Sequence, residues 1–220
     1  MTKAFDRIAR EAHEIWTSSP RRHDNSASAE ALRYLPLADH SKLNFHIIDV
    51  QASCPSEFRI NTLIERTDQQ RNGATTFGEH PDQGYIREKV APVYDSARDS
   101  REPITDLVQA GAGTKFYVYD RLILPQRVKS GRSAWAIGIV LPRLILPLAP
   151  AQPELTPREE AVLDHLLLGL PPKDIARKLN LSQRTVEHRI VDLRSKFGAN
   201  SVTHLVALAT ANALAEKNTS

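Results

Sequence analysis

The last third of the chain carries a succession of helix start and stop signals, and this series constrains the fold more than any other feature. Thr156 precedes Pro157, and Glu159 follows three residues after the threonine. This spacing is typical of a capping box with proline at the first helical position. Apolar residues then recur at helical spacing as far as Gly169, where glycine favours a stop. The pattern predicts a helix between Thr156 and Gly169.

Three further helices are predicted after this one. Pro172 starts a short helix over residues 172–179, and Ser182 is placed to cap a longer polar helix over residues 183–197. Ser201 caps a fourth helix. A short helix, a tight turn and a polar helix with a basic flank form the arrangement that places one helix in the major groove of DNA.

The third predicted helix has an outward face that remains once its apolar stripe is set aside. Arginine binds a guanine edge or a phosphate, and glutamate accepts a hydrogen bond from cytosine N4. The alternative is an ordinary solvated helix face, which the ordered caps and the tight turn disfavour. The outward residues are Gln183, Arg184, Glu187, His188, Val191 and Arg194.

Residues 154–214 resemble the LuxR-type helix-turn-helix domain of bacterial transcription regulators, also called the FixJ/NarL type. The resemblance covers about a quarter of the chain. In that family the third helix enters the major groove and the fourth mediates dimerisation. The matching residues are Leu155, Thr156, Pro157, Arg158, Glu159, Val162, Leu163, Gly169, Lys173, Asp174, Ile175, Ala176, Leu179, Ser182, Thr185, Val186, Glu187, Leu193, Lys196 and Gly198.

The resemblance implies which residues meet DNA. Glu187, His188 and Val191 are expected to face base edges, and Gln183 belongs to the same DNA-binding set. The residues expected mostly to hold the phosphate backbone are Lys173, Ser182, Arg184, Thr185, Arg189, Arg194 and Lys196.

One departure from the family pattern affects these contacts. The family usually has histidine four residues after the threonine, where this chain has Arg189, and the histidine stands one step earlier at His188. The family's base contacts therefore do not transfer directly. The departure keeps open an alternative function, a protein-interaction adaptor whose helical domain oligomerises without binding DNA.

A homodimer is expected, with two candidate interfaces. The resemblance implies one on the fourth helix, through Leu205, Leu208 and Leu214. The other is an amphipathic helix predicted near the N-terminus, over residues 3–17. Its apolar residues either form a dimer surface or dock onto the chain's own sheet, and both interpretations stay open. The candidate dimerisation residues of this helix are Phe5, Ile8, Ile15 and Trp16.

The N-terminal part mixes predicted strands and helices. Strand patterns occupy residues 44–50 and 58–64, and a helical pattern bent at Pro92 fills residues 80–100. Three further strand patterns follow, over residues 104–109, 115–124 and 133–140.

This element order is similar to that of a PAS domain, a family that senses ligands, cofactors or partner proteins. The expected fold class is an α+β N-terminal PAS-like domain, with an antiparallel sheet and helices, plus an all-α C-terminal domain of four helices. The expected boundaries are a sensory and dimerisation domain over 1–145, a proline-rich linker over 146–153 and the DNA-binding domain over 154–220. The linker follows from four prolines within residues 141–153.

Rival sensor classes fit the N-terminal part less well. A phosphoacceptor receiver domain would alternate strands and helices. An acyl-homoserine-lactone domain would place tyrosine four residues after tryptophan, and neither Trp16 nor Trp135 has one there.

Composition limits the partners and the compartment. The net charge is only +3, although the pI near 9.1 suits nucleic acid. A single cysteine, Cys54, excludes an internal disulfide and suits a reducing cytoplasm. The longest apolar stretch outside the helices is interrupted by Pro142, Arg143 and Pro147, so no membrane association is expected.

Catalytic and metal chemistry has no positive signal in the sequence. The eight histidines show no ligand spacing, and Cys54 has no cysteine partner. The expected protein is a cytoplasmic, non-enzymatic transcription regulator that binds double-stranded DNA. A small-molecule ligand or a partner protein is expected at the N-terminal domain, and the sequence identifies no cofactor.

Overall fold

The computed structural model describes residues 3–21, 26–39, 42–65, 75–149 and 153–217. The chain divides into two compact units. One comprises residues 1–113 and 117–144, and the other residues 114–116 and 145–220.

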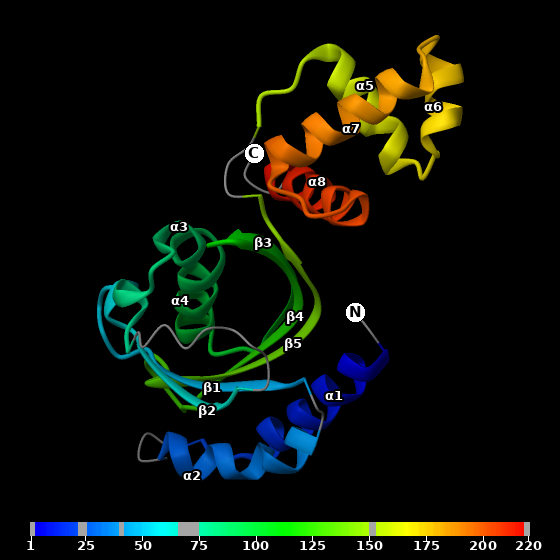
Figure 1. Ribbon diagram of the computed structural model, residues 1–220. Helices are drawn as coiled ribbons and strands as arrows, with labels where there is room; N and C mark the ends of the chain where they lie inside the picture. Colours follow the sequence, from blue (N-terminus) through cyan, green and yellow to red (C-terminus); the bar gives the residue numbers. More distant parts are fainter. Residues whose placement is uncertain (1–2, 22–25, 40–41, 66–74, 150–152, 218–220) are drawn as a thin grey trace. The chain divides into compact units, whose positions relative to one another are not determined.

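The first unit is built on a five-stranded antiparallel sheet (Figure 1). The strand order is β2-β1-β5-β4-β3, and β1 pairs antiparallel with both β2 and β5. The pairing of β1 with β5 joins two segments about 90 residues apart, with Phe45 opposite Ile139. The strands are β1 (Asn44–Asp49), β2 (Arg59–Ile64), β3 (Ile104–Ala112), β4 (Lys115–Pro125) and β5 (Trp135–Pro147).

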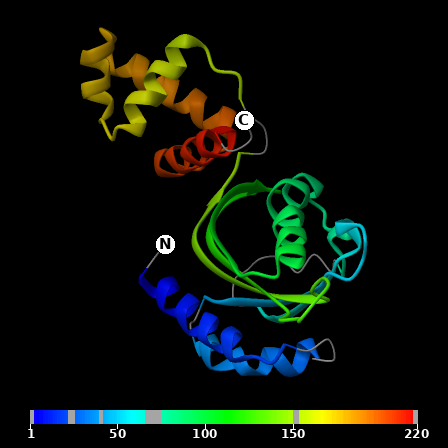
Figure 2. The same ribbon diagram turned by 180° about the vertical axis from the view of Figure 1, so that it is seen from behind.

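Helices cover both faces of this sheet because its central strands bury side chains on both sides. On β1, Phe45 and Ile47 belong to one buried cluster and Ile48 to another, as the two-residue alternation of a strand requires. Figures 1 and 2 show α1 (Lys3–Ser18) and α2 (Ala27–Ala31) on one face of the sheet, with α4 (Ala91–Ser100) on the other.

The first helix docks onto its own sheet. Phe5 and Ile8 are 0% and 2% exposed and pack in the core cluster beneath the sheet. Their apolar area is therefore buried within the chain, as the docking interpretation expected, and a dimer contact through α1 stays a prediction. Ile15 and Trp16 are half-buried against the same cluster.

The helical segment between β2 and β3 differs from the single bent helix that was predicted. It consists of α3 (Gln83–Tyr85), a π-helical turn (Ile86–Val90) and α4. The Ala91 N–H bonds to Ile86 O, five residues back. Pro92 has no N–H, and its ring disfavours the regular turn before it. The proline therefore favours the wider π-helical turn that precedes it.

The last strand is longer than its pattern indicated. β5 was predicted to end at residue 140, yet it continues through Pro142 to Pro147, so the expected linker over 146–153 begins inside the strand. Pairing with β1 stops at Val140, so one edge of β5 lacks its β1 partner beyond that point. Proline's missing donor costs less on an unpaired edge. Residues 150–152 of the expected linker lie outside the described residues.

The second unit contains the four helices that the sequence predicted. They are α5 (Pro157–Leu167), α6 (Pro172–Leu179), α7 (Gln183–Phe197) and α8 (Val202–Lys217). All four contribute to one buried cluster, including Val162, Ile175, Val186 and Leu205, each 0% exposed. The expected fold class, an antiparallel sheet with helices followed by an all-α domain, is confirmed.

No helix in the described part of the chain is long and apolar enough to span a membrane.

Candidate nucleic-acid interface

The turn between α6 and α7 is fixed by short polar residues. Asn180 ends α6 in the left-handed region at φ 52°, which asparagine tolerates better than most residues. The Leu181 N–H donates to Ala176 O at 2.9 Å. Ser182 Oγ then accepts from the Thr185 N–H at 3.0 Å and caps α7. These local bonds set the angle at which α7 leaves the turn.

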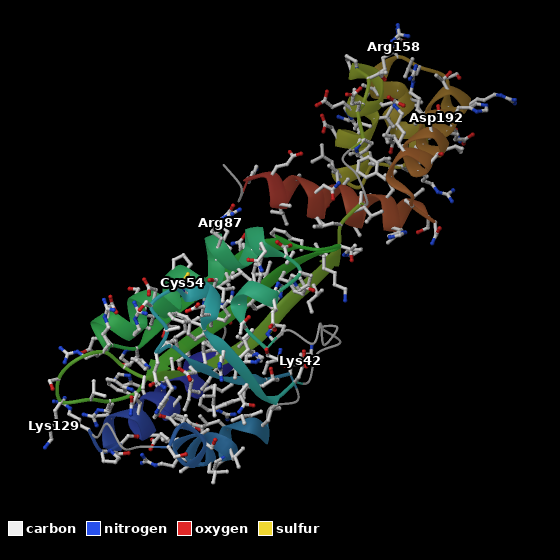
Figure 3. All side chains as sticks on the ribbon, turned by 90° about the vertical axis from the view of Figure 1, so that its left-hand side faces the viewer. Lys42, Cys54, Arg87, Lys129, Arg158 and Asp192 are labelled. Atoms are coloured by element: carbon white, nitrogen blue, oxygen red, sulfur yellow. The ribbon has the colours of Figure 1, made fainter. Side chains whose placement is uncertain are left out.

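One side of α7 is anchored in the core, which leaves the opposite side to solvent. Val186, Ile190, Leu193 and Phe197 are all at most 6% exposed. The exposed side carries Gln183, Arg184, Glu187, His188, Val191 and Asp192. Figure 3 labels Asp192, one of the exposed residues of α7. The predicted outward face therefore lies at the surface of this unit, with Arg194 as the exception.

Val191 is the unusual member of this face. It is 57% exposed although it is apolar and surrounded by polar neighbours. An exposed valine on a helix gains nothing from water and little from helix propensity. It is available for an apolar contact with a partner.

Gln183 and Glu187 are joined on the same face. Gln183 Nε2 donates to Glu187 Oε1 at 2.8 Å, one helical turn apart. The sequence placed both residues in the DNA-binding set but did not indicate that they are bonded to each other. The signal was present in their i, i+4 spacing, which brings such side chains together on a helix.

Two cations expected at phosphates are used inside the domain. Lys196 Nζ donates to Glu159 Oε2 at 2.9 Å and to Glu154 O at 3.0 Å. Arg194 Nη2 donates to Asn200 O at 2.7 Å, and its Nε is buried. Both side chains are therefore bonded within the domain in this structure, and their expected contacts with the phosphate backbone stay predictions.

The remaining phosphate-binding candidates lie at the start of α6 and the first half of α7. Lys173, Ser182 and Arg184 are exposed, while Thr185 and Arg189 are half-buried. The structure adds one cation that the resemblance did not include, because Lys178 is exposed in the last turn of α6. Basic side chains and helix N-termini are the usual partners of phosphate.

Glu159 is the most strongly perturbed acid of the domain. Its bond from Lys196, together with those from the N–H and hydroxyl of Thr156, lowers its pKa to about 2 from 4.5. The capping box predicted from sequence is present in full. Its carboxylate also holds the last turn of α7, so Glu159 joins two helices.

Two of the three dimerisation residues expected on α8 are buried within the domain. Leu205 and Leu208 are 0% and 3% exposed in the cluster of the domain itself. These two residues therefore hold α8 against its own domain, and the expected dimer contact through α8 stays a prediction. Leu214 is half-buried, and the exposed residues of α8 include Val202 and Ala213.

The interior of the first unit contains a polar cluster between the π-helical turn and the sheet. The Tyr85 and Tyr119 hydroxyls lie 2.5 Å apart. Arg121 binds Asp106 through two nitrogens and donates from Nη1 to Lys89 O at 2.6 Å. Both β4 residues therefore tie the sheet to the helical segment that follows β2.

No metal-binding group is found where side chains are described. Among these residues, no cluster of three or more histidine, cysteine or acidic side chains has the geometry to hold a metal ion. Cys54 is exposed, with its Sγ 2.9 Å from Ser56 Oγ.

Comparison with known proteins identifies the family of the C-terminal domain. Residues 153–209 match the family described as bacterial regulatory proteins, luxR family. Response regulator Rre1 of a Synechocystis strain is 43% identical over 68 residues, which cover 31% of this chain and 29% of that protein. FixJ of Bradyrhizobium diazoefficiens is 44% identical over 55 residues, covering 25% and 27%. The chain thus matches less than a third of the length of these relatives.

Solved structures give longer but distant alignments. The Vibrio cholerae VqmA dimer is 20% identical, covers 84% of this chain and 88% of its own, and has a TM-score of 0.31. Escherichia coli SdiA is 14% identical, covers 96% and 99%, and has a TM-score of 0.28. These scores are too low to support an argument about the N-terminal unit. The family match and the helix geometry together establish that residues 153–209 form a LuxR-type helix-turn-helix domain.

Proposed function

We propose that this protein is a cytoplasmic, non-enzymatic transcription regulator that binds double-stranded DNA as a homodimer through α7. The observation that carries the proposal is the exposed polar face of α7 within a segment that matches the luxR family. The relatives FixJ and Rre1 bear the names of a transcriptional regulatory protein and a response regulator. They share only this domain with the chain, so the function of the whole protein is our inference.

In the proposed complex, α7 enters the major groove with its N-terminal half toward the bases. Glu187, His188 and Val191 face base edges, and Arg184 and Lys173 meet the phosphates on either side. Ser182 and Thr185 add hydroxyl groups near the N-terminus of α7, where the helix dipole favours a phosphate. Two copies would read half-sites about one turn of duplex apart, roughly 10 base pairs.

The N-terminal unit is the proposed sensor. Its antiparallel sheet, with a helical segment between the second and third strands, supports a PAS-like role in which a small molecule or partner protein modulates DNA binding. A signal acts on such a protein only if it binds one conformation of the regulator more tightly than the other. The proposal assigns no cofactor to this unit.

A genomic binding map of the full-length protein tests the DNA-binding proposal directly. We expect the map to show discrete bound sites. In a gel shift, the protein should stay bound to these sites when excess non-specific DNA is added. Arg184→Glu should abolish the bound sites, because it places a negative charge beside a phosphate. Arg87→Glu, a matched charge reversal at an exposed site of the sensor unit, should leave them intact.

The adaptor alternative predicts the opposite result. The internal bonds of Arg194 and Lys196 give it some support, because they engage two cations of the expected DNA-facing set within the domain. If the protein oligomerises but binds no DNA even at low salt, the adaptor function replaces the proposed regulator function.

A further inference from the structure

We infer that Gln183, Glu187 and Val191 form one base-reading strip on α7 that selects a base with an amino group in the major groove, followed by a thymine methyl. The inference rests on the proposed function, because it concerns which bases α7 reads. It goes further by assigning each of the three side chains a chemical task and by predicting the bases that satisfy them.

The three residues share one face of the helix. They follow one another at intervals of four positions, which places side chains in a row along a helix. All three are exposed, and Val191 is 57% exposed. The buried residues Val186 and Ile190 lie three positions after Gln183 and Glu187, so the row runs along the border between the exposed and the buried sides of α7. The row is therefore presented to a partner by the packing of the domain.

The hydrogen bond between Gln183 and Glu187 decides what the row offers. Gln183 Nε2 donates to Glu187 Oε1 at 2.8 Å, which uses one of the donors of the pair. Glu187 pairs with no cation among the described residues. Glu187 still offers its second carboxylate oxygen, which is an acceptor, while the Gln183 amide keeps its oxygen as an acceptor and its second N–H as a donor.

Acceptors on a major-groove helix require donors on the bases. Cytosine N4 and adenine N6 are the only amino donors in the major groove, whereas guanine presents N7 and O6 and thymine presents O4, all acceptors. A carboxylate opposite guanine or thymine would repel those atoms. The Glu187 carboxylate, which can only accept, should therefore select cytosine or adenine at the position that it reaches.

Val191 completes the strip two turns after Gln183. Its branched apolar side chain has no polar partner to offer, and the only apolar group in the major groove is the thymine methyl. Contact with that methyl would remove apolar surface of both groups from water. We therefore expect a thymine near the base read by Glu187.

Gln183 acts in this arrangement as a positioning residue. It holds the Glu187 carboxylate in one orientation, which reduces the freedom lost on binding. Gln183→Ala should keep cytosine or adenine as the preferred base at this position, but the other bases should be tolerated more often. Glu187→Gln should change the preferred base itself, because the new amide carries a donor as well as an acceptor.

Selection from a randomised duplex pool with the full-length protein provides the first test. We compare the wild-type protein with Glu187→Gln, Gln183→Ala, Val191→Ala and, as a matched control, Asp192→Asn, which neutralises another exposed acid of α7. Glu187→Gln should alter one position of the selected site and Val191→Ala a neighbouring one. Asp192→Asn should reproduce the wild-type site.

Single-atom changes in the selected duplex provide the second test. Replacing the thymine with uracil deletes only the methyl group. Replacing an adenine with unsubstituted purine, or a cytosine with pyrimidin-2-one, on the same deoxyribose deletes only the amino group. Wild-type affinity should fall on the order of tenfold for the amino deletion and by less for the methyl deletion. Glu187→Gln should lose much of its sensitivity to the amino deletion, and Val191→Ala its sensitivity to the methyl deletion.

The possible failures of the strip and of the proposed function are distinguishable. Salt-dependent binding with a selected site that none of the three substitutions alters would overturn the strip and leave DNA binding in place. A site altered equally by Asp192→Asn would also overturn it. Absence of any salt-dependent binding would remove both the strip and the proposed function.

Discussion

Lys196 Nζ lies 2.9 Å from Glu159 Oε2, so the last turn of α7 is held against the first turn of α5. The lysine is also bonded to Glu154 O, and the glutamate completes the capping box with Thr156. One carboxylate thus starts a helix and fixes the far end of the proposed recognition helix. This arrangement gives Lys196 a structural role in addition to the phosphate contact that the resemblance implies.

The Glu159 carboxylate should make stability depend on pH below neutrality. Its pKa falls to about 2 in the folded state from 4.5, so the unfolded chain binds the proton at higher pH than the folded chain. The contribution is present in full above pH 4.5 and is lost as the pH falls towards 2. Glu159→Gln should lower the melting temperature at pH 7, and the difference from wild type should shrink between pH 5 and pH 2.

Thermal melts of both proteins at several pH values measure this difference directly. Glu160→Gln, one residue later and exposed, is the control and should track the wild type. A Glu159→Gln protein that stays equally far below wild type at every pH would show that the ion pair is not the source.

Arg184→Ala should reduce DNA affinity for all sequences. We expect the slope of log affinity against log salt to become shallower by about 1, the mark of one lost phosphate contact. Fluorescence anisotropy at four or five salt concentrations gives the slope. Arg87→Ala removes the same charge from an exposed site of the other unit and should leave the slope unchanged. An unchanged slope for Arg184→Ala would withdraw this residue from the phosphate set.

Gly138→Ala should destabilise the N-terminal unit. The added Cβ would lie 2.1 Å from the Tyr94 hydroxyl oxygen, far inside contact distance. Tyr94 is only 4% exposed, so it has little room to move. Overpacking of this kind typically costs about 1–3 kcal/mol. Chemical denaturation of the full-length protein measures the change.

Tyr94→Phe supplies the matched test of that mechanism, because it removes the hydroxyl that the new methyl group meets. The double variant Gly138→Ala/Tyr94→Phe should be more stable than the sum of the single effects predicts. Additive effects would indicate that Gly138 is required for another reason.

Arg127→Ala should loosen the end of α1. Arg127 Nη1 donates to Ser19 O at 2.7 Å and also to Thr17 O, and the guanidinium lies 5.1 Å from the centre of the Trp16 ring. Loss of these contacts should cost about 1–3 kcal/mol locally. Hydrogen exchange of the α1 amides should accelerate, while exchange in α7 should not change.

Arg127→Lys serves as the conservative variant in the same measurement. Lysine keeps the charge but lacks the planar fork that bonds several carbonyls and stacks on a ring, so it should rescue little. Full rescue by lysine would mean that charge alone holds the helix.

The sequence by itself determined the four helices of the LuxR-type domain. Their ends are set by local chemistry, in which Thr156 and Ser182 cap through bonds to residues three positions away and Gly198 ends α7 at φ 65°. Interactions of such short range are written in consecutive residues. The order of strands and helices in the N-terminal unit was accessible for a similar reason, because two-residue and helical periodicities are local.

Only the tertiary structure decided which side chains remain free to meet a partner. Phe5, Ile8, Leu205 and Leu208 look like interface residues in the sequence, yet each packs within its own unit. Lys196 and Arg194 look like free cations, yet both bond within the domain. Periodicity shows that a helix has an apolar face but not which surface that face meets, because burial depends on elements that are distant in the chain and meet only in the fold.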